Sequence, residues 1–162
     1  WALDGGGCLM NQCIHGIDLL MHIAGPVKSV LAKCKTLARR IEVEDTAVII
    51  VTFENGAVGV IEAATSVNPG QDTIISVHGT EGNIAFGNDG FNIWQTNDNS
   101  KKPDICDNMG GVNCGWAGDN LHAIMVEDMA QAVLEGRDPM IPGEEARIAV
   151  DLILAVYESS KS

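Results

Sequence analysis

A histidine and an aspartate lie three residues apart near the start of the chain, directly after a run of glycines. A neutral imidazole can take up a proton near neutral pH because its ordinary pKa is about 6.5. Residues three apart share one face of a helix, and glycines let a backbone approach another surface closely. The spacing therefore predicts half of an active site, in which His15 performs general acid–base chemistry and Asp18 supports it. The segment reads Gly5-Gly6-Gly7-Cys8-Leu9-Met10-Asn11-Gln12-Cys13-Ile14-His15-Gly16-Ile17-Asp18.

Asn11 precedes His15 by four residues and can reach the same helix face. Two roles are open for it: capping the helix N-terminus, or binding a substrate hydroxyl. His22 extends the same stripe, but the helical rise of 1.5 Å per residue separates three such ligands by more than ~10 Å. Metal bonds are only ~2 Å long, so no metal site is expected. Cys8 and Cys13 are expected to be packing residues, because small thiols beside a site are usually buried.

The elements that must position these residues follow from the periodicity of apolar residues. Helices are predicted at residues 12–24, 119–135 and 144–159. Strands are predicted at 27–37, 45–53, 57–65, 73–78, 83–86 and 91–94, with hairpin turns at Asn55-Gly56 and at residues 79–82. Residues 95–118 form a long polar segment that is either functional or disordered. The predicted fold class is α+β: an open, mostly antiparallel mixed β-sheet of about six strands with helices packed on one face.

The other face of this sheet needs solvent or a partner. In residues 46–53 neither alternating set of side chains is strongly polar. Coverage by a second copy is therefore favoured over solvation, and the chain is expected to form a homo-oligomer through the sheet face.

Length and composition limit the remaining classes of function. The 162 residues fit one domain, and no apolar run reaches the ~20 residues of a membrane span. A net charge of -12, with only 10 Lys and Arg residues, argues against nucleic acid as a partner. The five cysteines are odd in number and include no CxxC pair, which favours a reducing cytoplasm. The start at Trp1, without Met or signal peptide, suggests a piece of a longer protein.

Six ordered segments of the chain resemble the C-terminal domain of the Gfo/Idh/MocA oxidoreductases, which include glucose-fructose oxidoreductase and inositol dehydrogenase. They are residues 5–20, 41–47, 53–57, 78–84, 132–139 and 155–160. The resemblance implies a two-domain enzyme that binds NAD or NADP mainly through an N-terminal Rossmann domain. It further implies oxidation of a secondary alcohol of a sugar, cyclitol or related compound, or the reverse reduction. No strand-GxGxxG-helix unit occurs here, so the chain lacks the Rossmann domain and is expected to be inactive alone.

An Asp-x-x-x-His motif of that family aligns with Asn11-Gln12-Cys13-Ile14-His15, so the resemblance implies that His15 is the catalytic histidine. Asn11 stands where many relatives have Asp, and an amide cannot ionise, although it can still bind substrate through hydrogen bonds. Asn11 and Asp18 are accordingly expected to bind substrate or support the ring.

Two rival classes of function remain. In the first, residues 1–162 form a non-catalytic module for ligand binding or oligomerisation. In the second, the chain is part of a metal-dependent hydrolase, which would require stoichiometric metal in the purified protein. The sequence preceding Trp1 distinguishes the enzyme from the module, since only the enzyme needs a dinucleotide-binding domain there.

Overall fold

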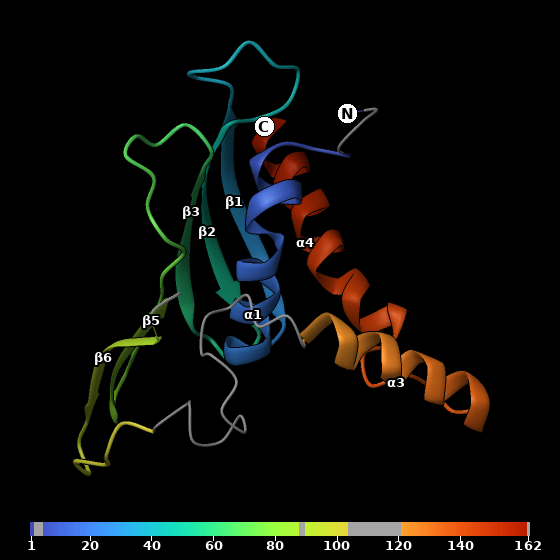
Figure 1. Ribbon diagram of the computed structural model, residues 1–162. Helices are drawn as coiled ribbons and strands as arrows, with labels where there is room; N and C mark the ends of the chain where they lie inside the picture. Colours follow the sequence, from blue (N-terminus) through green and yellow to red (C-terminus); the bar gives the residue numbers. More distant parts are fainter. Residues whose placement is uncertain (2–4, 88–89, 104–120, 162) are drawn as a thin grey trace. The chain divides into compact units, whose positions relative to one another are not determined.

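The structure is a computed structural model that describes Trp1 and residues 5–87, 90–103 and 121–161 (Figure 1). The chain divides into two compact units, Trp1–Gln71 with Pro142–Ser162, and Asp72–Ile141. Most of the predicted polar segment at 95–118 lies outside the described residues. The prediction that residues 1–162 act as one domain stays a prediction.

The first unit contains a three-stranded antiparallel sheet with two helices on one face. Its elements are the π-helix η1 (Leu9–Cys13), α1 (Ile14–Ala24), β1 (Val27–Lys35), β2 (Thr46–Phe53), β3 (Val58–Ala64) and α4 (Gly143–Lys161). The strand order is β1-β2-β3. In Figure 1, α1 and α4 run side by side across the sheet.

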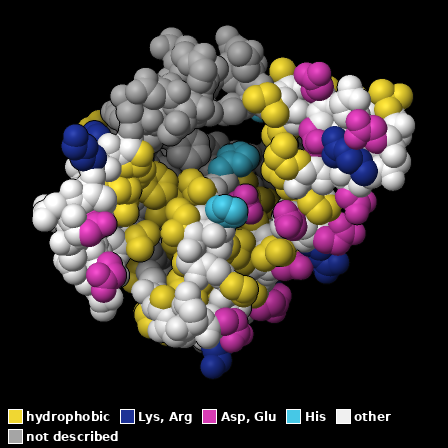
Figure 2. Space-filling model, turned by 90° about the horizontal axis from the view of Figure 1, so that it is seen from below, with side chains coloured by type: hydrophobic (Ala, Val, Ile, Leu, Met, Phe, Trp, Pro, Cys, Tyr) yellow, Lys and Arg dark blue, Asp and Glu magenta, His cyan; other side chains and the backbone are white. Residues whose placement is uncertain are grey.

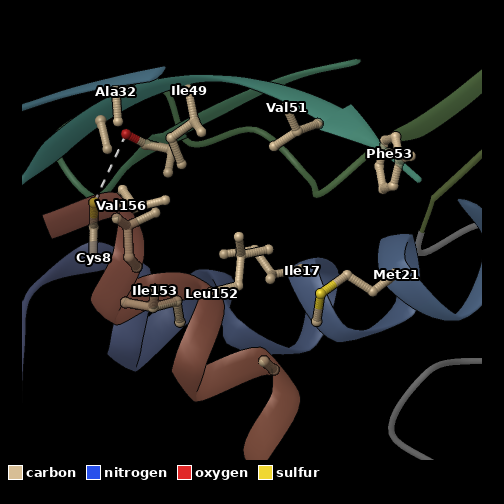
Figure 3. Packing of buried hydrophobic residues seen from close by; sticks show 14 residues of the cluster. Cys8, Ile17, Met21, Ala32, Ile49, Val51, Phe53, Leu152, Ile153 and Val156 are labelled. Atoms are coloured by element: carbon tan, nitrogen blue, oxygen red, sulfur yellow. Dashed lines mark hydrogen bonds between the residues drawn. The ribbon is translucent and has the colours of Figure 1, made fainter. Parts of the chain in front are cut away.

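Alternation along β2 determines which side of the sheet becomes the core. Ala47, Ile49, Val51 and Phe53 are buried, whereas Val48 and Ile50 are 47% and 45% exposed. The buried set meets the apolar sides of α1 and α4, and Figure 3 shows these side chains interdigitating between the sheet and the two helices. The helices therefore cover one face of this sheet, as predicted from the sequence.

The free edge of β1 is protected by two hydroxyl groups of α4. The Ala32 N–H donates to Ser159 Oγ at 3.1 Å, and the Cys34 N–H donates to Ser160 Oγ at 2.8 Å. An edge strand with unsatisfied N–H groups can pair with another chain. The serines satisfy two of these donors and fix α4 along β1.

The hairpin between β2 and β3 forms at the predicted Asn55-Gly56 turn. Gly56 has φ +89°, a conformation that favours glycine. Asn55 Oδ1 accepts a hydrogen bond from the Ala57 N–H, while Asn55 Nδ2 donates to the Ala24 carbonyl; both distances are 2.9 Å. The turn therefore also holds the C-terminal end of α1.

The second unit contains a separate antiparallel sheet, β4 (Ile75–Gly79), β5 (Gly82–Gly87) and β6 (Gly90–Thr96), together with α3 (Leu121–Glu135). Thr80 and Glu81 form the tight turn between β4 and β5, which confirms the turn predicted at residues 79–82. Phe91 packs edge to face on Phe86 and on Trp94. This aromatic row stabilises one face of the sheet.

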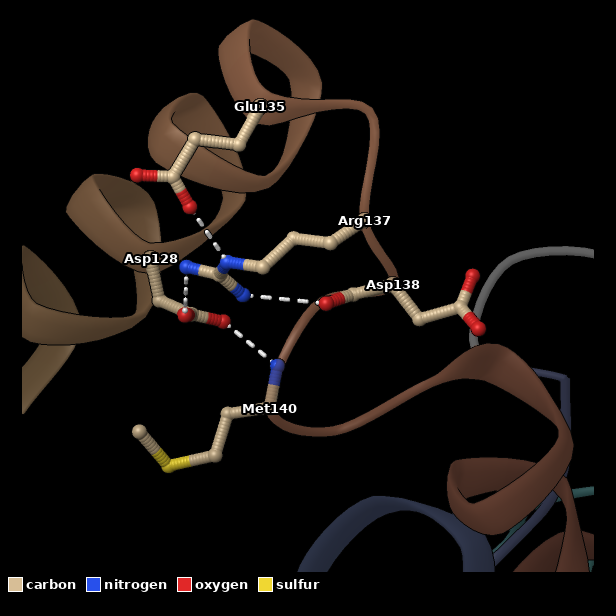
Figure 4. A network of polar contacts seen from close by, with 5 residues as sticks. All are labelled: Asp128, Glu135, Arg137, Asp138 and Met140. Atoms are coloured by element: carbon tan, nitrogen blue, oxygen red, sulfur yellow. Dashed lines mark hydrogen bonds and ion pairs between the residues drawn. The ribbon is translucent and has the colours of Figure 1, made fainter.

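The turn after α3 is closed by a polar network (Figure 4). Asp128 accepts hydrogen bonds from the Arg137 guanidinium at 2.9 Å and from the Met140 N–H at 2.6 Å. Gly136, at φ +67°, ends the helix as the sequence predicts. Of the apolar residues of α3, Ala132 is buried, but Ile124, Met125, Met129 and Val133 are all more than half exposed.

All six predicted strands are present, every described pairing is antiparallel, and the α+β class is confirmed. The strands form two sheets of three, however, instead of one sheet of about six. The alternation of residues identifies a strand and its inward face, but it carries little information about which strands become neighbours across a long connection. The Asn55-Gly56 and Thr80-Glu81 turns identify only the pairs that they join.

Buried Asp45 organises the loop between β1 and β2. Its carboxylate accepts hydrogen bonds at 2.8 Å from the N–H groups of Leu37, Ala38 and Arg39. The Leu37 N–H is the largest influence, and together these donors hold the pKa of the Asp45 carboxyl well below its ordinary value of 3.8, against the opposing effect of burial.

We expect Asp45 to contribute to acid sensitivity. A carboxyl whose pKa is lowered by folding stabilises the native state above its unfolded pKa, and this contribution is lost as the pH falls towards the folded pKa. Thermal unfolding should therefore show a midpoint that falls below about pH 4. The Asp45→Asn variant should have a lower midpoint at neutral pH and a shallower acid dependence. Asp151→Asn, at an exposed ion pair, is the control; equal acid profiles for all three proteins would contradict the assignment.

Candidate functional site

The predicted site residues lie along the exposed side of the first helix. Asn11 belongs to η1, and His15 and Asp18 belong to α1; all three are exposed. Ile17 and Met21 of the same helix are buried against the sheet. The helix thus has a packed side and a polar side, and the polar side carries the three predicted residues. His22 is exposed as well.

Within the described part of the chain, the structure records no hydrogen bond between His15 and Asp18. Asn11 Oδ1 accepts a hydrogen bond from Gln12 Nε2 at 2.8 Å. This contact does not use the two N–H groups of the Asn11 side-chain amide, which can act as donors. Asn11 is not the helix cap that was one of its two predicted roles. It lies inside η1, and the residue at the cap position, Cys8, makes no capping bond with its side chain.

The N-terminus of the helix is capped from a distance by Glu44. Glu44 Oε1 accepts a hydrogen bond from the Leu9 N–H at 3.0 Å, and the Glu44 carbonyl accepts one from the Cys8 N–H at 3.0 Å. Tyr157, on α4, donates its hydroxyl to Glu44 Oε1 at 3.0 Å. The N–H of Gly7 donates to that hydroxyl at 3.4 Å. Glu44 is only 6% exposed, so this network takes the place of water.

The glycine run makes room for this network. A Cβ atom at Gly7 would overlap the backbone carbonyl and the carboxylate of Glu44, and one at Gly6 would lie 2.8 Å from the Tyr157 hydroxyl. The sequence predicts a close approach by the glycines, and the structure shows one. The glycines face the interior, whereas His15 and Asp18 face outward, so the two polar side chains lie away from the surface that the glycines approach.

Burial determines the chemistry of the groups beside the network. Burial, followed by the charge of Glu44, raises the pKa of the Cys8 thiol to about 12. Burial raises the pKa of Cys13 too, and burial is the largest cause of the raised pKa of Tyr157. Cys8 also donates its thiol to the Ala63 carbonyl at 3.8 Å (Figure 3). A thiol that stays protonated at neutral pH is a poor nucleophile, in agreement with the predicted packing role.

Sequence reasoning missed Glu44 and Tyr157. Glu44 lies in a polar stretch before β2, where nothing in the sequence distinguishes a buried carboxylate from a solvated one. Tyr157 is the sole tyrosine of the chain and lies on the apolar stripe of α4. A lone hydroxyl on an otherwise apolar stripe was the available signal, because a buried tyrosine hydroxyl usually has a hydrogen-bond partner.

The helix N-terminus does not fit a dinucleotide. A glycine turn leading into a helix binds phosphate when its N–H groups are free, but Glu44 and Tyr157 occupy the N–H groups of Gly7, Cys8 and Leu9 here. A second anion would also be repelled by the Glu44 carboxylate.

Among the described residues, no group of three or more His, Cys, Asp or Glu side chains could hold a metal ion. No described helix is long and apolar enough to cross a membrane.

The first unit combines helices and an antiparallel sheet, and it presents His15 on a helix whose N-terminus is capped by Glu44. Residues 1–85 match the model of the GFO/IDH/MocA C-terminal domain. The chain therefore belongs to the GFO/IDH/MocA family, as the sequence resemblance indicates.

Individual relatives agree with this assignment. The chain is 40% identical over 93 residues to an uncharacterized oxidoreductase, YrbE, of Bacillus subtilis, and 29% identical over 90 residues to D-apiose dehydrogenase of Rhizobium rhizogenes. These matches span 54% and 53% of this chain, but only 27% and 26% of the relatives. The WlbA dehydrogenase of Bordetella pertussis, crystallised with NADH and UDP-GlcNAcA, has a similar structure with a TM-score of 0.76 and 28% identity. That similarity covers 96% of this chain and 43% of WlbA.

We expect Gly7→Ala to destabilise the protein by at least about 2 kcal/mol, because the added methyl group must displace backbone as well as side-chain atoms of Glu44. Gly143→Ala is the matched control, since a Cβ at Gly143 meets open space. Urea denaturation of both variants tests this. Equal unfolding midpoints for the two variants would contradict the close contact at Gly7.

Proposed function

We propose that this chain is the substrate-binding domain, with the catalytic histidine, of an NAD(P)-dependent oxidoreductase that acts on a secondary alcohol of a sugar, cyclitol or related compound. The observation that carries the proposal is the position of His15: exposed, on a helix whose other side is packed and whose N-terminus is capped. Membership of the GFO/IDH/MocA family supports it, as do relatives that include a D-apiose dehydrogenase and an NADH-bound WlbA dehydrogenase.

In the proposed reaction His15 accepts the proton of a substrate hydroxyl, or returns it in the reverse direction. Asn11 donates a hydrogen bond to a neighbouring substrate oxygen through the amide N–H groups that Gln12 leaves available. Asp18 binds a further hydroxyl as an acceptor. The nicotinamide, when bound, supplies the hydride chemistry. Since the capped glycine turn does not fit a pyrophosphate, we assign cofactor binding mainly to a Rossmann domain outside residues 1–162, and the chain alone is expected to be inactive.

The test is the replacement of His15 by Ala in the dehydrogenase that contains this chain. Loss of a general base should lower kcat by ~100-fold or more. His22→Ala is the matched control, because His22 is exposed on the same helix seven residues further on. Steady-state kinetics with the sugar or polyol substrate measure both. An unchanged kcat/KM for His15→Ala would leave the non-catalytic binding module as the better explanation.

We also propose that two copies of the chain associate through the outer face of the β1-β2-β3 sheet. This is the sheet face for which the sequence favours coverage by a second copy. Leu31, Ile50 and Val60 pair across the three strands and are 64%, 45% and 62% exposed. In the neighbouring rows, Val48 is exposed between Lys33 and Glu62, and Val58 is exposed beside Thr52. Hydrophobic side chains are exposed elsewhere too, as the view from below in Figure 2 shows. An exposed apolar row that is flanked by polar residues is typical of an interface.

Ile50→Lys should weaken this interface, because a buried, unpaired charge between two sheets is costly. We expect its mass in light scattering to fall from that of the oligomer to that of the monomer. Val67→Lys is the control, since Val67 is similarly exposed, at 50%, but lies in the segment after β3. A monomeric unchanged protein, or an oligomeric Ile50→Lys variant, would contradict the interface.

A further inference from the structure

We propose that Glu44 and Tyr157 are positioning residues for the reaction, which set the location of His15 and Asn11 by holding the N-terminus of their helix. This inference rests on the proposed function, since it assumes that His15 transfers the proton. The network is buried, so its effect on the reaction passes through the helix that carries Asn11 and His15.

The helix has no local cap from the side chain at its N-cap position, Cys8. The first N–H groups of a helix have no partner within the helix. Here the Leu9 N–H is buried with a residue that is 0% exposed, and its acceptor is the Glu44 carboxylate at 3.0 Å. Water therefore cannot replace Glu44 without opening the core. The negative charge also lies at the positive end of the helix dipole, which strengthens the contact.

A continuous helical backbone connects this cap to Asn11 and His15. Asn11 donates its N–H to the Gly7 carbonyl at 3.0 Å, and η1 continues into α1 without a break between Cys13 and Ile14. A tilt or shift at Leu9 is therefore transmitted to Asn11 and His15. A displacement of about 1 Å at a reacting group can lower a rate about 100-fold, so a small movement of the cap is sufficient to matter.

The cap itself is anchored to the start of β2 and to α4. Glu44 directly precedes the buried Asp45 and the start of β2, and Tyr157 reaches it from α4. The Trp1 ring packs edge to face on the Tyr157 ring at a centroid distance of 5.4 Å. The helix that carries His15 is thus held to the sheet and to α4 through Glu44, at the point where the glycines permit close contact.

A purely structural role would give a different result from a positioning role, and Asp45 allows the two to be separated. Asp45 is the neighbouring residue, is 0% exposed and also accepts several backbone hydrogen bonds, but its donors belong to the loop at residues 37–39. Loss of Asp45 should therefore cost stability without moving the helix. Asp45→Asn is the matched control for a Glu44 variant.

The experiment uses the dehydrogenase that contains this chain, assayed below the unfolding temperature of each variant. We expect Glu44→Ala to lower kcat about 10- to 100-fold, with the KM for the nicotinamide cofactor unchanged. Glu44→Gln keeps an oxygen acceptor for the Leu9 N–H, so it should retain kcat within about threefold of the unchanged enzyme. Asp45→Asn should retain the unchanged kcat. In the His15→Ala background, Glu44→Ala should lower kcat by a smaller factor than it does in the unchanged enzyme, because only Asn11 is then left to position.

Tyr157→Phe is the second variant, to be used in the same double-mutant cycle if Glu44→Ala does not fold. It removes the hydroxyl shared by Glu44 and Gly7 but keeps the ring beside Trp1. A folded Glu44→Ala enzyme with unchanged kcat would overturn the inference, as would an equal loss in Asp45→Asn or an additive loss in the His15→Ala background. Full activity of His15→Ala alone would instead overturn the proposed function.

Discussion

The burial of one carboxylate, Glu44, is the constraint on which the arrangement of the first unit depends. A buried carboxylate is costly unless its oxygens receive hydrogen bonds. Glu44 receives them from the Leu9 N–H and the Tyr157 hydroxyl, and each donor brings a whole element with it. Because Leu9 begins η1 and Tyr157 lies on α4, satisfying one side chain brings both helices to the start of β2. The absence of side chains at Gly6 and Gly7 is the steric condition for this contact.

Asp45 extends the same principle in another direction. It is fully buried and adjacent to Glu44. The Glu44 carboxylate faces the helix, whereas the Asp45 carboxylate faces the loop at residues 37–39, where it accepts hydrogen bonds from three backbone N–H groups. Two consecutive acidic residues thus organise both neighbours of β2 in a protein whose charged groups are predominantly acidic, with 22 Asp and Glu against 10 Lys and Arg.

The features that sequence reasoning predicted correctly are those that depend on local chemistry. The run of β-branched residues at 46–52 located β2, the Asn55-Gly56 turn located its hairpin, and Gly136 located the end of α3. The features that it missed depend on partners distant in the sequence: Leu9 and Glu44 are 35 residues apart, and Gly7 and Tyr157 are 150 apart. The π-helical turn at residues 9–13 and the separation into two sheets also have no local signature. His15 and Asn11 could be proposed as site residues from their types and spacing, but the hydrogen bonds of Glu44 that anchor their helix could not be predicted.

The exposure of His15 has a consequence for how the site works. The described helix supplies a rigid histidine and hydrogen-bonding groups on one side only, while proton transfer and substrate selection both benefit from excluding water. If His15 transfers the proton, a second surface must cover the polar side of α1 during the reaction. That surface can position a substrate only against a helix that does not move under it. The long-range cap at Glu44 ties the helix to β2 and α4, whereas a serine or aspartate at position 8 would cap the helix only locally.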